Sequence, residues 1–400
     1  MDPIKNPYTP NAGSRPPELA GRDAELERFR ILVARLRQGW TEQSLIIKGL
    51  RGVGKTVLLN AFEDQAEREG FLTYYHELTP GSNLIEDLAR DAARALAVLD
   101  LGQRLLQQVR QAFAHTKTIR LTGPGELGLA VDLQKANEGT ITADLTELFL
   151  QLGAVAQAKG RGVAFFLDEV QFAEEVQYRS LISALHRATQ KSLPITVAAA
   201  GLPQIPRLTG EARSYAERLF DMPTIGNLEP DDARAALVEP ARQQGVEYED
   251  AAVERALKWT EGYPFYIQQL GKHAWNLATS SPITEEVVEE AIPVAQAALD
   301  STIYEVRIQR TTNKERSYLR AMAELGDGPY RSGEVAKLLG QKVSGVSLIR
   351  QQLLDKGLIY ATEEWGHVDF TVPRFAEFMR RLLPYEPPRS HKRKRGASGK

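Results

Sequence analysis

The segment GLRGVGKT, residues 49–56, constrains the fold of this chain more than any other stretch. It has glycines at its first and sixth positions and then lysine and threonine, the spacing G-x-x-x-x-G-K-[ST] of a phosphate-binding loop. A short apolar strand, Ser44–Lys48, precedes it, and a helix is expected to follow from Lys55. A strand, a glycine-rich turn and a helix in this order predict a P-loop at one edge of a parallel sheet.

Each residue type in this loop suits the binding of a nucleoside triphosphate. The turn directs successive N–H groups inward, side chains in place of the glycines would block the phosphates, and Gly52 adds backbone freedom. Lys55 supplies a charge for the β- and γ-phosphates, and Thr56 offers its hydroxyl to Mg²⁺ at the positive end of the helix. A chance match is the alternative, but both flanking elements fit. The expected ATP-binding residues are Gly49, Leu50, Arg51, Gly52, Val53, Gly54, Lys55, Thr56 and Val57.

A second part of the site is predicted in VAFFLDEVQ, residues 163–171. Its apolar residues form a buried strand, and Asp168 would emerge at the carboxyl end of that strand beside the P-loop. Asp168 would hold Mg²⁺ together with Thr56, and Glu169 would polarise the attacking water. Asp-Glu pairs also cap helices, but the position after a P-loop favours catalysis. Lys55 and Glu169 are therefore the expected catalytic residues.

Strands and helices alternate as far as residue 226, which predicts an α/β fold, a P-loop NTPase parallel sheet sandwiched by helices. The glycine-punctuated alternation over Ile119–Leu133 predicts a hairpin insertion. Four amphipathic segments then predict a helical lid, and three helices with a two-stranded wing predict a winged helix-turn-helix whose second helix is capped by Ser332. The expected parts are an N-terminal arm at 1–20, an ATPase domain at 21–226, a lid at 227–300, a winged helix at 301–385 and a basic tail at 386–400.

The third helix of this winged helix, within VSGVSLIRQQLLDKG, is expected to enter a DNA major groove. Its serine, arginine and glutamine side chains can contact phosphates or base edges, and the cationic tail can hold the backbone. The expected buried side consists of Val346, Leu348, Ile349, Leu353 and Leu354. The residues expected to contact double-stranded DNA are Lys342, Ser344, Ser347, Arg350, Lys392, Arg393, Lys394 and Arg395.

A protein-interaction or autoinhibitory module is the alternative for the same unit. The expected DNA face holds only two firm cations, Lys342 and Arg350, and the expected wing carries Glu363 and Glu364. A DNA-binding surface is normally rich in lysine and arginine, so both hypotheses stay open.

Composition limits the compartment and the partners. The chain has no cysteine, which excludes disulfides, thiolate zinc sites and cysteine nucleophiles and suits the cytoplasm. The longest apolar runs have the length of strands, so no membrane span is expected. The net charge is −2, yet RSHKRKRGASGK at the end of the chain is strongly basic, which leaves an acidic body. Such a tail often contacts nucleic acid, although a solvated terminus has the same composition.

The order GRDAELERF, GLRGVGKT, LDEVQ, AAGLP, ERLF and EGYPF resembles bacterial and archaeal P-loop ATPases of the AAA+/STAND type, above all those related to origin-recognition initiators. The resemblance implies that Gly21-Arg22 packs near the base and that Pro264, after Gly262-Tyr263, lies near the nucleotide. It also implies an arginine finger at Arg218, with Arg213 as a fallback, that reaches a neighbouring subunit's site. The alternatives are a plain helix start for Gly21-Arg22, a break between lid helices for Gly262-Tyr263-Pro264 and a surface arginine for Arg218.

Two departures from that family favour a slow switch over rapid turnover. The strand ending in AAAGLP lacks a polar residue at its tip, with Gln204 nearby but unassigned, and the lid has Tyr-Pro-Phe where initiators carry an arginine. No [NT]KxD-like motif is present, so adenine is preferred over guanine. The sequence thus predicts an ATP-binding, slowly hydrolysing switch, which couples nucleotide state to DNA binding and possesses a homo-oligomeric or protein partner. The alternative is a STAND-like signalling or defence ATPase whose winged helix binds protein or inhibits the core.

Overall fold

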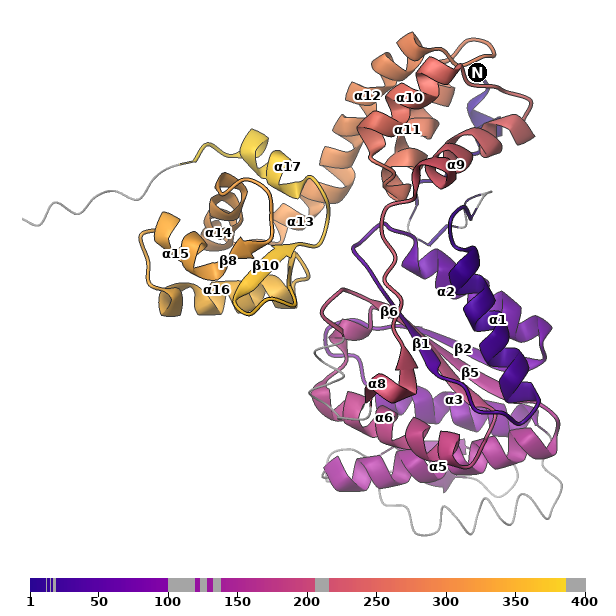
Figure 1. Ribbon diagram of the computed structural model, residues 1–400. Helices are drawn as coiled ribbons and strands as arrows, with labels where there is room; N and C mark the ends of the chain where they lie inside the picture. Colours follow the sequence, from indigo (N-terminus) through magenta and orange to yellow (C-terminus); the bar gives the residue numbers. More distant parts are fainter. Residues whose placement is uncertain are drawn as a thin grey trace, which may run out of the picture. The chain divides into compact units, whose positions relative to one another are not determined.

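The computed structural model describes residues 1–11, 13–14, 16, 19–99, 119–122, 128–131, 138–205 and 216–385. The chain forms two compact units, Met1–Ala295 and Gln296–Lys400 (Figure 1). Within the described ranges, no helix combines the length and the apolar character needed to cross a membrane.

A five-stranded parallel sheet forms the centre of the first unit (Figure 1). Its strands are β1 (Ser44–Lys48), β2 (Phe71–Glu77), β5 (Gly162–Asp168), β6 (Ile195–Gly201) and β7 (Phe220–Asp221). They lie in the order β2-β5-β6-β1-β7, with Lys48 of β1 opposite Gly201 of β6. Because all pairs are parallel, the carboxyl ends of β1, β5 and β6 meet at one edge of the sheet.

Helices cover both faces of this sheet, since β5 and β6 are buried along their whole length. The helices are α1 (Asp23–Arg37), α2 (Lys55–Arg68), α3 (Leu84–Val98), α5 (Glu138–Ala158) and α6 (Glu175–Gln190). On one face, Phe29 of α1 stacks on Phe62 of α2 with ring centroids 4.4 Å apart and lies against Phe166 of β5. On the other face, α3, α5 and α6 bury a continuous apolar layer against the strands (Figure 1). The predicted α/β class with a parallel sheet between helices is confirmed.

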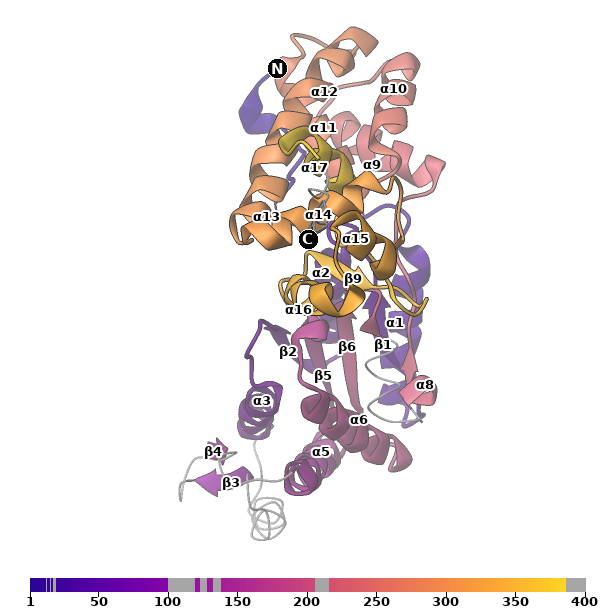
Figure 2. The same cartoon turned by 90° about the vertical axis from the view of Figure 1, so that its left-hand side faces the viewer.

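An antiparallel hairpin, β3 (Ile119–Thr122) and β4 (Gly128–Val131), interrupts the alternation between α3 and α5. It forms a separate two-stranded sheet in which Thr122 lies opposite Gly128, and β4 packs against α3 (Figure 2). The glycine-punctuated pattern therefore folds as the insertion that the sequence predicts.

Four helices follow the sheet, and they enclose an apolar core of their own. They are α9 (Pro230–Gln243), α10 (Asp250–Thr260), α11 (Pro264–Leu277) and α12 (Glu285–Leu299), the last of which continues into the second unit. The N-terminal segment, which includes the short helix η1 (Pro3–Lys5), docks on α11. Tyr8 is only 2% exposed in the helical core, Asn6 donates to the carbonyl of Lys272 at 2.9 Å, and Trp275 donates to the carbonyl of Asp2 at 2.9 Å.

The second unit consists of short helices and a three-stranded antiparallel sheet in the order β8-β10-β9. In chain order its elements are η3 (Asp300–Glu305), α13 (Val306–Gln309), α14 (Asn313–Glu324), β8 (Tyr330–Arg331), α15 (Ser332–Leu338), α16 (Val343–Asp355), β9 (Ile359–Ala361), β10 (His367–Phe370) and α17 (Phe375–Leu382). Thr312 caps α14 in a reciprocal capping box with Glu315, and Glu315 pairs with Lys356 at 2.7 Å. The sequence predicts only the hairpin β9–β10, because β8 is two residues long.

Two local predictions for the second unit are wrong. Ser332 is the first residue of α15, and Arg331 occupies the N-cap without a side-chain hydrogen bond. Leu348 is 68% exposed although its apolar character places it in the expected core. The reason is that Val346 and Leu353 are buried and Ile349 and Leu354 are half-buried on one face of α16, whereas Leu348 projects from the other face.

Candidate nucleotide site

The loop between β1 and α2 has a backbone that only glycine can follow at several positions. Gly52 and Gly54 have φ values of +84° and +94°, in the left-handed region. A Cβ on Gly49 would lie 2.4 Å from the carbonyl oxygen of Ile225. Gly54 is also the N-cap of α2 and gives that helix no side-chain cap, so its first amides are available to an anion.

Lys55 is buried at the start of α2 and donates to the loop itself. Its Nζ lies 3.0 Å from the carbonyl oxygen of Gly49 and 2.8 Å from that of Leu50. Burial lowers the pKa of Lys55 from its usual 10.5 to about 8, against the opposing effect of Glu169 and Asp168. The ammonium group is thus weakly solvated. It lies where the oxygens of a bound phosphate would replace the two carbonyl oxygens as its hydrogen-bond acceptors.

Thr56 and Asp168 meet across the edge of the sheet, as the sequence predicts for two metal ligands. Thr56 Oγ1 donates to Asp168 Oδ2 at 2.6 Å, and Asp168 is 2% exposed. The hydroxyl of Tyr75 on β2 donates to the same carboxylate oxygen at 3.1 Å. A hydroxyl and a carboxylate side by side next to a phosphate-binding loop fit Mg²⁺, which binds hard oxygen ligands. In the described ranges no group of three or more His, Cys, Asp or Glu side chains could hold a metal, so phosphate and water oxygens would complete this shell.

Glu169 follows the strand in a left-handed conformation, with φ 52°, which turns it away from the strand direction. Arg51 of the loop faces it, with Nη1 3.4 Å from Oε1 and Nη2 3.4 Å from Oε2. Gln171, in the short helix η2 (Val170–Phe172), donates its amide to Oε2 as well. The predicted base is therefore within reach of the loop and is held there by two side chains.

Arg22 forms hydrogen bonds to the backbone of the phosphate-binding loop and of the segment before the lid. Its Nη2 donates to the carbonyls of Val53 at 3.2 Å and Gly226 at 2.7 Å, and only 8% of the residue is exposed. Burial lowers the pKa of Arg22, while Glu25 and Asp232 oppose that shift. The Gly21-Arg22 segment thus lies against the loop. The resemblance leads us to expect this segment near the adenine base of the nucleotide.

The first turn of the lid helix α11 also reaches the loop. A Cβ on Gly52 would lie 3.1 Å from the hydroxyl oxygen of Tyr263 and 3.2 Å from Cβ of Phe265. Pro264, between these two residues, is the first residue of α11. Gly262 has φ +71°, and a Cβ there would lie 2.4 Å from the carbonyl oxygen of Leu228. The segment 262–265 therefore sits beside the loop, where Pro264 is expected to approach a nucleotide.

Arg218 lies elsewhere. It belongs to the short helix α8 (Ala216–Leu219), is exposed, and its carbonyl accepts a hydrogen bond from Gln43 at 3.2 Å. Gln43 precedes β1, whereas the loop follows that strand, so Arg218 lies at the opposite end of β1 from its own nucleotide site. Any role as an arginine finger would have to be in a second subunit, and Arg213 lies outside the described residues.

The predicted DNA-contacting residues belong to the second unit. Lys342, Ser344 and Ser347 are exposed at the start of α16, with Ser347 donating to the carbonyl of Ser344 at 2.9 Å, while Arg350 is half-buried. The cations of the tail, Lys392, Arg393, Lys394 and Arg395, lie outside the described residues.

Sequence reasoning misses two residues of this edge, Tyr75 and Gln171. Tyr75 precedes the end of β2, and the register that sets Glu77 opposite Asp168 brings its hydroxyl to that carboxylate. Gln171 follows Glu169 by two residues and also accepts a hydrogen bond from the amide of Leu202, after β6, at 3.1 Å. The sequence contains a signal for both residues. Each is a polar residue near the carboxyl end of a parallel strand, and such side chains gather at one edge of the sheet.

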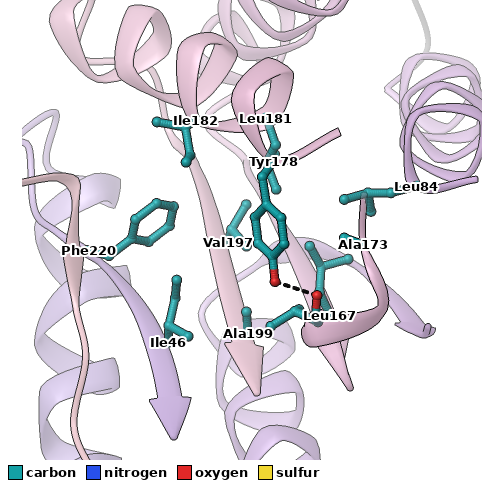
Figure 3. Close-up of a pocket in the computed structure, with 11 residues that line it drawn as sticks. Ile46, Leu84, Leu167, Ala173, Tyr178, Leu181, Ile182, Val197, Ala199 and Phe220 are labelled. Carbon is teal, nitrogen blue, oxygen red and sulfur yellow. Dashed lines mark hydrogen bonds between the residues drawn. The ribbon is translucent and has the colours of Figure 1, made fainter. Parts of the chain in front are cut away.

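A small cavity between the sheet and α6 is part of the core and offers no polar group for a ligand (Figure 3). It is lined by apolar side chains such as Ile46, Leu167, Val197 and Phe220, and the hydroxyl of Tyr178 donates to the carbonyl of Val170 beside it (Figure 3). The chemistry of this molecule is therefore expected at the edge of the sheet.

Comparisons with known proteins agree with this fold. Residues 18–198 match a family model described as an AAA ATPase domain, and residues 301–379 match one described as a domain of unknown function. No curated protein sequence matches the chain.

Three solved structures illustrate the likeness. A Walker-type ATPase of Pyrococcus abyssi is 16% identical with a TM-score of 0.54, over 92% of this chain and 97% of that one. The RuvB Holliday junction branch migration motor of Thermotoga maritima is 17% identical with a TM-score of 0.47, over 94% and 99%. The Orc1 protein of Aeropyrum pernix in complex with DNA is 16% identical with a TM-score of 0.44, over 92% and 96%. Only the first score is high enough to support a shared fold, and identities this low indicate nothing about activity.

The strand order and the loop together define a P-loop NTPase fold, and residues 18–198 of it match the AAA ATPase domain model. The matched domain supports nucleotide binding and ATPase activity in general. The finer assignments, from the STAND type to the winged helix and its partner, stay predictions.

Proposed function

We propose that this chain is a Mg²⁺-dependent, slowly hydrolysing ATP switch that passes its nucleotide state through the lid to a DNA-binding winged helix. One observation carries the proposal: Lys55, Thr56, Asp168 and Glu169 come together at the carboxyl edge of β1 and β5, with Thr56 Oγ1 2.6 Å from Asp168 Oδ2. The AAA ATPase domain match over residues 18–198 supports the same class of activity.

Each side chain then has a definite task. The amides of the loop and of the first turn of α2 bind the β- and γ-phosphates, and Lys55 exchanges its two carbonyl partners for phosphate oxygens. Thr56 and Asp168 would hold Mg²⁺, which neutralises phosphate charge when bound. Glu169 takes a proton from water as the water oxygen bonds to the γ-phosphorus and the bond to the ADP oxygen breaks.

Slow turnover is supported by the surroundings of the base. Both oxygens of Glu169 accept hydrogen bonds from Arg51 or Gln171, so these bonds must rearrange before the base can accept a proton from water. Arg218 lies away from its own site, so it can assist only in a homo-oligomer. We therefore expect turnover well below the enzyme median of about 10 s⁻¹.

The lid is the element that senses the nucleotide in this proposal. The turn at Tyr263–Phe265 touches Gly52 of the loop, so a change in loop conformation displaces the start of α11. The same helix carries the docked N-terminal segment and is followed by α12, which continues into the second unit. A loop-to-lid contact of this kind allows nucleotide state to bias a two-state element.

DNA binding is the first candidate for the second unit. Three helices, α14 to α16, followed by the antiparallel pair β9 and β10, have the element order of a winged helix. Lys342, Ser344 and Ser347 are exposed on α16, the helix that would enter the groove, and the basic tail follows α17. Such a surface would bind duplex DNA mainly through phosphates, and its affinity would fall steeply with salt.

A protein partner is the second candidate, and exposed apolar side chains favour it. Val343 and Leu348 of α16 are 55% and 68% exposed, and Trp365, between β9 and β10, is 90% exposed. Glu363 and Glu364 beside Trp365 are also exposed and would repel phosphates. In a STAND-like ATPase this surface would contact another protein or the chain's own core.

Phosphate release tests the catalytic part of the proposal. Lys55→Ala is expected to lose ATP binding, and Glu169→Gln is expected to keep binding but to lose at least about 100-fold in turnover, as for a general base. Equal turnover by the wild type and Glu169→Gln would remove that residue from the mechanism.

Titration of a labelled DNA duplex at two salt concentrations separates the two candidates for the second unit. Salt-dependent binding that is lost on deletion of residues 386–400, or weakened by Arg350→Ala, supports the DNA switch. Leu348→Ser is the matched control, because it removes an exposed apolar group and no charge. ATP-dependent oligomers that ignore DNA and are lost in Leu348→Ser would support the second candidate.

A further inference from the structure

The side chain of Arg51 takes no part in the bond-making and bond-breaking steps above, yet it occupies a central position. It projects from the phosphate-binding loop, between Leu50 and Gly52, and only 24% of it is exposed. Its two terminal nitrogens face Glu169 at 3.4 Å each, which is long for a charge-assisted pair, usually 2.7–2.9 Å. Its Nε is buried and has no hydrogen-bond partner among the described residues. A half-buried guanidinium with one unpaired buried donor and two long hydrogen bonds is able to bind a better anion.

Glu169, unlike Arg51, has a hydrogen-bond partner at each of its polar side-chain atoms. Its Oε2 accepts from both Arg51 and Gln171, and its Oε1 accepts from Arg51. Gln171 is fixed in turn, because its amide oxygen accepts from the backbone amide of Leu202 at 3.1 Å. Release of Arg51 would therefore leave Glu169 positioned by Gln171 and with one oxygen free for water.

We propose that Arg51 acts in its own subunit as a γ-phosphate sensor, which exchanges Glu169 for the γ-phosphate of ATP and so frees the base only when a triphosphate is bound. The inference rests on the proposed ATPase function and adds to it the means of telling ATP from ADP. Arg51 takes no part in bond making or breaking. Water supplies the oxygen, the proton goes to Glu169, and ADP leaves with the electron pair of the broken bond.

The chemistry of the guanidinium suits this exchange better than that of the neighbouring ammonium group. Arginine presents several planar donors that match a phosphate with two parallel hydrogen bonds, and it stays charged at any physiological pH. Lys55 already reaches the loop carbonyls of Gly49 and Leu50, where the β-phosphate is expected, so it cannot separate ADP from ATP alone. Arg51 faces the carboxylate that must act on the γ-phosphate, so it reports on that group specifically.

Equilibrium binding of ADP and of a non-hydrolysable imido analogue of ATP, both with Mg²⁺, tests the proposal. Arg51→Ala is expected to weaken the analogue by about tenfold or more, the effect of one lost charge-assisted contact, while ADP affinity changes less than about twofold. Arg51→Lys is expected to recover only part of the loss, because an ammonium lacks the planar pair of donors. Arg37→Ala is the matched control, since Arg37 pairs with Glu69 at 3.1 Å on the surface of the same unit and should change neither affinity.

A double-mutant cycle with Glu169→Gln gives the second readout. Removal of the competing carboxylate should tighten the ATP analogue in the wild-type background, and this gain should disappear when Arg51 is alanine. A gain of equal size in both backgrounds would show a general charge effect and would overturn the exchange, as would an unchanged ratio of ADP to analogue affinity in Arg51→Ala. Failure of the wild type to bind either nucleotide would instead refute the proposed function, so the two failures are distinguishable.

Discussion

The carboxyl edge of β1 and β5 in the first unit contrasts with the outer face of α16 in the second. At the edge, Lys55, Thr56 and Glu169 all have partners within the protein, and Asp168 is 2% exposed. On α16, Leu348 is 68% exposed and the neighbouring serines are open to solvent. A buried polar cluster defines the chemistry of its ligand, whereas an exposed mixed face is compatible with several partners. The contrast teaches why one region supports a mechanism and the other supports only candidates.

The largest expected effect concerns the carboxyl edge of β1 and β5 in the first unit. Asp168→Asn removes the charge that would hold Mg²⁺ and should reduce turnover by about 100-fold or more, consistent with several kcal/mol of metal-ion stabilisation. Added Mg²⁺ should restore part of the activity, measured as phosphate release over a range of metal concentrations. Tyr75→Phe, which removes only the 3.1 Å hydrogen bond to the same carboxylate, is the control and should cost less than about tenfold. If Asp168→Asn had wild-type metal dependence, the carboxylate would not be a ligand.

The second prediction tests whether Val346 and Leu348 lie on opposite faces of α16. Val346 is 0% exposed, so Val346→Ser should lower the free energy of unfolding of the second unit by about 2–4 kcal/mol. Leu348→Ser on the same helix should change it by less than about 0.5 kcal/mol. Denaturant unfolding followed by circular dichroism measures both. Equal losses would mean that Leu348 is covered in solution.

A third prediction concerns the close backbone contact between Gly262 and Leu228, next to the segment of the lid that reaches the loop. Gly262→Ala should destabilise the first unit by about 2 kcal/mol, because a left-handed alanine is strained and its Cβ would meet the carbonyl of Leu228 at 2.4 Å. Gly245→Ala, also in the lid with φ +75° but with nothing within 4 Å, should show the smaller cost of the φ angle alone. Thermal unfolding of the two variants separates strain from collision. Equal melting temperatures would show that the close approach is relaxed in solution.

The smallest expected effect comes from pH and concerns only the buried edge. The pKa of Lys55 is lowered to about 8, so the lysine is mostly charged at pH 7 and mostly neutral at pH 9. If phosphates bind the charged form, ADP affinity should fall about tenfold between these values, with uptake of a proton at pH 9. For folding the sign is opposite: the free energy of unfolding rises with pH from about 8 to 10.5, because the unfolded state keeps the proton longer. Calorimetry in buffers of different ionisation enthalpy measures the uptake, and affinity independent of pH would contradict the shift.

The sequence could predict the buried edge because its parts are local. A short segment with three spaced glycines, a lysine and a threonine specifies the loop, and an apolar strand before Asp168 specifies the second part of the edge. What brings Tyr75 to that edge is the register of β2 against β5, and what brings Arg51 to Glu169 is the left-handed turn at Glu169. Both are tertiary facts, and no spacing along the chain encodes them.

The face of α16 was harder to predict because apolar residues are a poor guide to burial on a short helix. Of the five apolar positions expected to be buried, Val346 and Leu353 are buried and Ile349 and Leu354 half-buried, but Leu348 faces solvent. The strand β8 is two residues long, too short for an alternating pattern, and Ser332, a good cap by residue type, begins the helix instead. In a small unit the packing of neighbours overrides local preference.

The docked N-terminal segment has a practical use. Asp2, Asn6 and Tyr8 are tied to the lid, whereas Ile4 in their midst is 93% exposed. Because the sequence contains no cysteine, a single Ile4→Cys change would create one thiol for a fluorescent dye. A reporter at that point would travel with α11 and follow its displacement in real time, at a distance from the chemistry it monitors.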